Sequence, residues 1–103
     1  MNLGSNVLII DDDGTLRRTL TRILQTADCE VSSACTGQEG LRLLSANPYN
    51  LVYLDIRLPD INGLEVLREI RKSFPQLPVV VFTGHGTLQS AMEALRLGRR
   101  ITC

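Results

Sequence analysis

Short apolar runs alternate along the chain with longer segments in which apolar residues recur at helical spacing. Three of the runs are continuous and lie at residues 7–10, 51–54 and 79–82. Runs of this length between turn residues are typical of parallel strands that are buried on both faces. Residues 30–34 alternate only weakly between apolar and polar side chains, so we expect a further strand there, nearer an edge of the sheet.

Helical periodicity fills the segments between the strands. The stripe that predicts the first helix consists of Leu16, Leu20, Ile23 and Leu24. A second helix is predicted over residues 37–46 and is stopped by Asn47 and Pro48, because proline cannot continue a helix. A third helix is predicted over residues 64–74, and its inward side chains are expected to be Leu64, Leu67, Ile70 and Phe74.

A fourth helix is predicted to begin near Thr87, which can cap it, and to end at Gly98. Its apolar residues are Leu88, Ala91, Met92 and Leu95. Strands that alternate with helices in this way predict an α/β domain, in which helices cover both faces of a doubly wound parallel sheet.

Polar side chains follow three of the predicted strands at the point where each strand ends. Asp11, Asp12 and Asp13 follow the first run, Asp55 follows residues 51–54, and Thr83 follows residues 79–82. In an open α/β sheet the ligand site lies beyond the carboxyl ends of the strands, so we expect these groups to converge on one pocket. Clustered carboxylates repel one another unless a cation offsets their charge, and Mg²⁺ suits such a site.

Length, charge and cysteine content give no indication of a nucleic-acid-binding, membrane or disulfide-rich protein. The chain has 103 residues, enough for one domain with its own core, and its 11 basic residues balance its 11 acidic ones. This balance gives no indication of nucleic-acid or membrane binding, and no apolar run is long enough to span a bilayer. The first residues lack the pattern of a secretory signal, and the 3 cysteines have no CxxC spacing. We therefore expect a cytoplasmic protein.

The residues alone leave other interpretations open. The acidic triplet can simply end a strand and cap the next helix, and Asp13 is best interpreted as such a cap or as a residue that lies just outside the metal ligands. Residues 9–16 (IIDDDGTL) also fit the first motif of haloacid dehalogenase-like phosphatases, with Asp11 as nucleophile and Asp13 as general acid/base. Such an enzyme also needs a suitably placed lysine and a later acidic motif, but Lys72 is the only lysine and nothing acidic follows Glu93. A further alternative is a domain of the same α/β fold that accepts no phosphoryl group and serves only as an interaction module.

Three segments carry a specific resemblance. The sequences VLIIDDDGTLRRTL at residues 7–20, LVYLDIRLPDINGLEVLREIR at residues 51–71 and VVVFTGHGTLQSAMEALRLG at residues 79–98 resemble the receiver domains of two-component response regulators. The resemblance implies a flavodoxin-like sheet of strand order 2-1-3-4-5, here 2-1-3-4 with the fifth strand and helix missing. We expect an N-terminal extension at residues 1–5, an incomplete receiver domain at residues 6–98 and a divergent tail at residues 99–103.

The resemblance also implies a role for each matched position. Asp55 falls at the aspartate that accepts a phosphoryl group from a histidine kinase. Asp11 and Asp12 fall at the acidic pair that binds Mg²⁺, with Asp12 as the direct ligand. Arg57 falls where the backbone carbonyl supplies another metal ligand, and Thr83 falls at the hydroxyl that contacts a phosphoryl oxygen and shifts on activation. The family therefore implies a phosphoacceptor rather than an enzyme.

The chain departs from the family after Gly98. Receiver domains continue with a fifth strand, a Lys-Pro pair and a fifth helix, whereas this sequence ends in Arg99-Arg100-Ile101-Thr102-Cys103. We expect impaired phosphorylation, because the lysine that contacts the phosphoryl group has no counterpart. We also expect a homodimer or higher oligomer, because residues 79–82 would form a bare sheet edge, and such edges pair with other chains.

Overall fold

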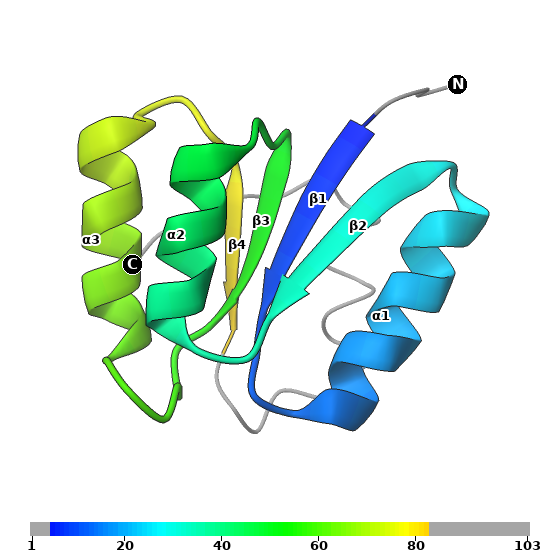
Figure 1. The fold of residues 1–103 in the computed structure, drawn as a ribbon, viewed down its shortest axis with the longest axis horizontal. Coiled ribbons are helices and arrows are strands. Elements are labelled where there is room, and N and C mark those ends of the chain that lie inside the picture. Colours follow the sequence, from blue (N-terminus) through cyan, green and yellow to red (C-terminus); the bar gives the residue numbers. More distant parts are fainter. Residues whose placement is uncertain (1–4, 83–103) are drawn as a thin grey trace.

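A computed structural model describes residues 5–82 (Figure 1). Strands and helices alternate in it along the chain. In order they are β1 (Ser5–Ile10), α1 (Gly14–Thr26), β2 (Cys29–Ala34), α2 (Gly37–Ala46), β3 (Leu51–Asp55), α3 (Gly63–Ser73) and β4 (Val79–Phe82). The strands form one sheet of order β2-β1-β3-β4 in which every pair is parallel. The predicted α/β class and strand order are therefore confirmed.

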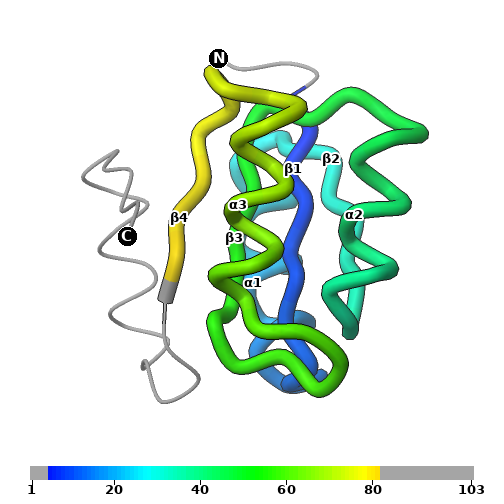
Figure 2. The backbone as a smooth tube through the Cα atoms, turned by 90° about the vertical axis from the view of Figure 1, so that its left-hand side faces the viewer, coloured from blue at the N-terminus to red at the C-terminus, as the bar shows by residue number. Residues whose placement is uncertain are grey.

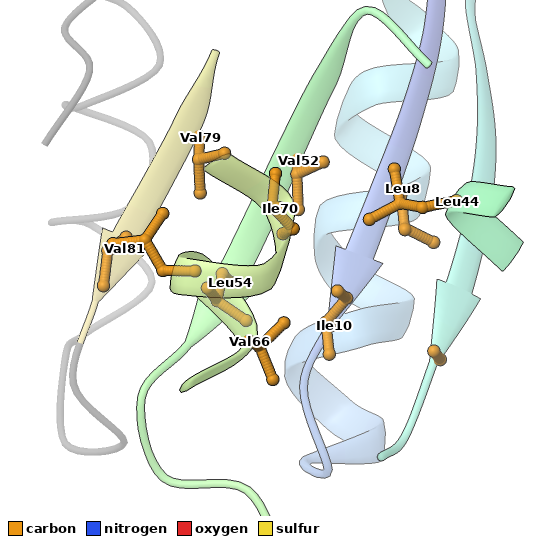
Figure 3. Close-up of a cluster of buried hydrophobic side chains, with 11 residues drawn as sticks. Leu8, Ile10, Leu44, Val52, Leu54, Val66, Ile70, Val79 and Val81 are labelled. Carbon is orange, nitrogen blue, oxygen red and sulfur yellow. The ribbon is translucent and has the colours of Figure 1, made fainter. Parts of the chain in front are cut away.

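One face of the sheet is covered by α2 and α3. Successive side chains of a strand point to opposite faces, and on this face Leu8 and Ile10 of β1 are buried. They belong to one hydrophobic cluster with Leu44 of α2 and with Val66 and Ile70 of α3. Figure 3 shows these side chains converging from the strands and the two helices.

The opposite face is covered by α1. Here Val7 and Ile9 of β1 form a second cluster with Leu20 and Leu24 of α1 and with Tyr53 of β3. The central strand β1 is therefore buried on both sides, which explains why its sequence is apolar without interruption. In Figure 2, β4 runs beside β3 at the edge of the described sheet.

Within residues 5–82, each helix follows a residue whose side chain accepts backbone N–H bonds from the first turn. Asp13 accepts from Thr15 and Leu16 at 3.0 and 3.3 Å, which confirms its predicted role as a cap. Thr36 does the same for α2, and Asn62 does so for α3. The caps fix where each helix leaves the carboxyl edge of the sheet.

Hydrogen bonds at the two ends of β1 fix its register against its neighbours. At the amino end, the Asn6 N–H donates to the Asn50 side-chain oxygen, and the Asn50 N–H donates to the Asn6 carbonyl, both at 2.7 Å. At the carboxyl end, the Asp11 N–H donates to the Ala34 carbonyl at 3.0 Å. These bonds lie beyond the apolar stretch that forms the core.

The third helix spans residues 63–73 rather than 64–74, and its buried face differs from the prediction because Leu64 is only half-buried. It ends at Ser73, and Phe74 adopts φ −135° and ψ 72°, outside the helical region. The predicted inward position of Phe74 is therefore wrong, and its side chain is 36% exposed. Val66, which the prediction omitted, is fully buried instead, because Val66, Leu67 and Ile70 recur at helical spacing toward the sheet.

Several predictions lie outside the described residues. These are residues 1–4 of the predicted N-terminal extension, the fourth helix, the Thr83 hydroxyl and the separate character of residues 99–103. Within residues 5–82, no helix combines the length and the apolar character that crossing a membrane requires.

Candidate functional site

Three carboxylates meet at the carboxyl edge of the sheet. Asp11 directly follows β1, and Asp55 is the last residue of β3. Ile10 pairs with Leu54 in the parallel register, so the next residue of each strand lies beside the other. One oxygen from each of Asp11, Asp12 and Asp55 lies within 4.8 Å of the others. The predicted convergence of these three side chains is therefore present in the structure.

The side chain of Asp11 is almost completely buried, with 1% of its surface exposed. Its Oδ1 accepts the Asp13 N–H at 2.9 Å, and its backbone carbonyl accepts a bond of 2.6 Å from the Arg17 guanidinium. Its Oδ2 is buried without a hydrogen-bond partner. A buried carboxylate oxygen without a donor is costly, so this atom marks a place where a cation would be stabilising.

Asp55 is held by the loop that follows it, residues 56–62, which we call the acceptor loop. Asp55 is 2% exposed, and its Oδ1 accepts the Arg57 N–H at 3.0 Å. The loop closes on itself where the Gly63 N–H donates to the Ile56 carbonyl at 2.8 Å. A Cβ at Gly63 would lie 2.5 Å from the Asp55 carbonyl oxygen. Glycine is therefore required for this close approach between α3 and the end of β3.

Burial disfavours the charged form of both buried carboxylates, and the charge of the neighbouring Asp12 adds to this effect for each. Desolvation is the largest cause that raises the pKa of Asp11 to about 7, and the charges of Asp55 and Asp12 add to it, while the Asp13 N–H opposes it. Desolvation also raises the pKa of Asp55, against the opposing bond from the Arg57 N–H. The pocket thus concentrates negative charge that a cation would stabilise.

The residues present fit a hard divalent cation. Carboxylate oxygens are the ligands that Mg²⁺ prefers, and it usually binds one or two carboxylates and keeps several waters. Asp11 and Asp55 are buried, whereas Asp12 is exposed, so the cluster has both an anchored side and a side open to solvent. The unpartnered Asp11 Oδ2 gives independent support for this fit.

The geometry does not favour the phosphatase interpretation. In that interpretation Asp13 acts as general acid/base beside Asp11, but the Asp13 carboxylate accepts bonds from the first turn of α1. Lys72 lies on α3 with its ammonium 3.5 Å from Glu69, and its side chain is 68% exposed. Neither side chain is thus placed as the phosphatase motif requires.

One residue of the acceptor loop was not predicted to take part in any contact. No sequence pattern singled out Asp60, yet its two carboxylate oxygens accept the N–H groups of Gly37 and Gln38, each at 2.9 Å. Its partners lie 23 and 22 residues earlier in the chain, and no local pattern indicates so distant a contact. The metal-binding role of the Arg57 carbonyl stays a prediction.

Comparison with known proteins gives a family for this arrangement. A family model for the response regulator receiver domain matches residues 7–100. The C4-dicarboxylate transport transcriptional regulatory protein DctD of Rhizobium meliloti is 38% identical over 98 residues, which is 95% of this chain and 21% of that protein. A putative NtrX-like response regulator of Rickettsia conorii is 35% identical over 95 residues, covering 90% of this chain and 20% of that protein. The chain thus spans about a fifth of the length of these curated relatives.

Solved structures agree with this assignment. A CheY-like receiver domain protein of Methanospirillum hungatei superposes with a TM-score of 0.77 at 33% identity, covering 94% of this chain and 77% of that one. The response regulator TrrA of Thermotoga maritima, solved in complex with Mg²⁺-BeF, gives a TM-score of 0.75 at 33% identity, covering 88% of this chain and 79% of that one. With its sheet order and its three carboxylates at the strand ends, the chain belongs to the response regulator receiver domains, the phosphoacceptor modules of two-component systems.

Proposed function

We propose that Asp55 is the residue that accepts the phosphoryl group, with Mg²⁺ held by Asp11, Asp12, Asp55 and the backbone carbonyl of Arg57. The observation that carries this proposal is the buried carboxylate of Asp55, which ends β3 within 4.8 Å of ligand oxygens of Asp11 and Asp12. The complex of TrrA with Mg²⁺-BeF supports the choice of metal.

The donor is a phosphorylated histidine of a sensor kinase. The P–N bond of the phosphohistidine breaks as a carboxylate oxygen of Asp55 forms a P–O bond, and a proton from solvent completes the released imidazole. Bound Mg²⁺ supplies charge neutralisation for the phosphoryl oxygens. The Arg57 N–H orients the attacking carboxylate through its bond to Oδ1. For Thr83, which lies outside the described residues, we propose a contact with a phosphoryl oxygen.

We also propose the domain bounds, the cellular location and the partner of this chain from its family. The receiver domain is proposed to begin with β1, whose first residue is Ser5, and to extend to residue 98, with residues 99–103 as a separate tail. It is a phosphoacceptor in the cytoplasm, whose partner is a sensor histidine kinase. The name of DctD, a transcriptional regulatory protein, supports a place in the control of transcription.

We also propose self-association along β4. Within residues 5–82 this strand pairs only with β3, and its sequence is wholly apolar. A strand with one partner presents unpaired backbone groups to a second chain. Sedimentation at micromolar concentration is expected to give a homodimer or larger species, and a strictly monomeric, folded protein would contradict this.

A small phosphodonor tests the acceptor directly. We expect incubation with acetyl phosphate and Mg²⁺ to add the mass of one phosphoryl group, and Asp55→Asn to abolish this adduct. Asp13→Asn is the matched control, and it is expected to keep the adduct. An adduct that survives in Asp55→Asn but not in Asp11→Asn would support the phosphatase instead. Absence of any adduct would favour the interaction module.

A further inference from the structure

We propose that Asp60 is a positioning residue for the metal site, because it ties the acceptor loop to the amino terminus of α2. The inference rests on the proposed function, in which the backbone carbonyl of Arg57 in this loop binds Mg²⁺. Asp60 is not itself a metal ligand. Through Asp60, the amino terminus of α2 is coupled to whether the pocket holds Mg²⁺.

The contact uses both oxygens of the Asp60 carboxylate. Oδ1 accepts the Gly37 N–H and Oδ2 accepts the Gln38 N–H, both at 2.9 Å. The first N–H groups of a helix have no partners within the helix, and a negative charge there is favoured by the helix dipole. These two bonds hold the pKa of Asp60 below its usual value, so the side chain keeps its charge at neutral pH.

The tip of the acceptor loop also packs against α2 through an apolar contact. A Cβ at Gly37 would lie 2.6 Å from Cγ1 of Ile61, the residue that follows Asp60. Ile61 also packs against the hydrophobic cluster that contains Val66. The loop therefore contacts α2 through a polar pair and an apolar pair at adjacent positions, and a shift of either element moves the other.

The base of the loop is fixed separately. The Gly63 N–H bonds the Ile56 carbonyl, and the Arg57 N–H bonds Asp55. Arg57 therefore lies between a base that is closed by local bonds and a tip that Asp60 holds. Without the bonds of Asp60, the tip loses its polar attachment to α2, and the position of the Arg57 carbonyl becomes less defined.

The cap of α2 does not depend on Asp60. The Thr36 side chain already accepts the Glu39 N–H at 3.1 Å, and Glu39 accepts the Cys35 N–H at 3.3 Å. This local arrangement is close to a capping box and is sufficient to begin a helix. The two bonds of Asp60 are additional to it, and what they add is the link to the acceptor loop.

Two alanine variants at the same helix terminus separate capping from positioning. We expect Asp60→Ala to weaken Mg²⁺ binding by about tenfold in calorimetric titration, the size typical of lost outer-shell support for metal ligands. Thr36→Ala removes a cap but leaves the loop attached, so its Mg²⁺ affinity is expected to equal that of the wild type. Asp60→Asn keeps one acceptor oxygen and is expected to fall between the two.

Hydrogen exchange of the wild type gives a second measurement that needs no variant. We expect Mg²⁺ to slow exchange of the Gly37 and Gln38 amides relative to those in the middle of α2. The inference is overturned if the Mg²⁺ affinity of Asp60→Ala is within twofold of that of the wild type, or if Thr36→Ala loses as much affinity. It is also overturned if Mg²⁺ does not change the exchange rates of the Gly37 and Gln38 amides. A wild-type protein that binds no Mg²⁺ would overturn the proposed function, and this inference with it.

Discussion

Asp11 and Asp55 are two buried carboxylates at the carboxyl ends of the adjacent parallel strands β1 and β3, and they bring ligand oxygens within 4.8 Å of each other. Both side chains are at most 2% exposed. Water screens charges poorly at such a site, so the repulsion between the two groups opposes folding. The fold therefore keeps a destabilising pair at the place where a cation is needed.

The stability of the metal-free protein should depend on pH through Asp11. Its pKa is raised from 3.8 to about 7 in the folded state, so between these values the folded protein binds a proton that the unfolded chain has released. The free energy of unfolding is therefore expected to fall as the pH rises through this interval. Urea unfolding with and without Mg²⁺ measures the effect, and Mg²⁺ is expected to restore stability near and above pH 7. Stability that rises across the interval without metal would contradict this.

Asp11→Asn should stabilise the metal-free protein while it weakens metal binding. Asparagine keeps an oxygen for the Asp13 N–H, which donates to Asp11 at 2.9 Å, and it removes one buried charge. We expect a gain of about 1–2 kcal/mol in the free energy of unfolding near neutral pH. The exposed Asp12 provides the control, because Asp12→Asn is expected to change stability far less. A loss of stability in Asp11→Asn would show that repulsion is not the dominant effect.

Gly63→Ala should be strongly destabilising. Its Cβ would lie 2.5 Å from the backbone carbonyl oxygen of Asp55, and backbone cannot move aside as a flexible side chain can. We expect a loss of about 3 kcal/mol in chemical unfolding. Gly14→Ala is the matched control, because the Cβ there meets only arginine side chains, at 3.3 Å and beyond. That variant is expected to be as stable as the wild type or more so.

Asp13→Ala should cost stability without affecting phosphorylation. The substitution removes the acceptor for the N–H groups of Thr15 and Leu16, and loss of such a cap costs about 1 kcal/mol. The Asp13 N–H that bonds Asp11 is kept, so we expect the rate of the acetyl phosphate reaction to be unchanged. A large fall in that rate would indicate a direct chemical role for Asp13.

The elements were predictable because their signals are local. The strands are short apolar runs, and the helices begin at Asp13, Thr36 and Asn62, whose side chains bond N–H groups within three residues. The grouping of Asp11 with Asp55 also followed, because a parallel sheet places its strand ends at one edge. The family resemblance supplied the strand order.

The contacts that were missed depend on distances in space rather than along the chain. Asp60 bonds residues 22 and 23 positions away, and no periodicity or spacing encodes such a pair. Phe74 was predicted to lie inward because it continues an apolar spacing, but the backbone leaves the helix at that residue. A pattern of side chains does not show where the backbone changes direction.

The hydrogen bonds between Asn6 and Asn50 at the amino end of β1 have a consequence for the acidic pocket at its carboxyl end. If β1 slipped by one residue against its neighbours, each of its side chains would move to the opposite face of the sheet. Because β1 is apolar on both faces, hydrophobic side chains would still be buried in both clusters. The same slip would move Asp11 past Asp55 by about 3.3 Å, the rise of one strand residue. The reciprocal bonds of Asn6 and Asn50 oppose that slip. An amide pair on the far rim of the sheet therefore helps to set the spacing between the two carboxylates.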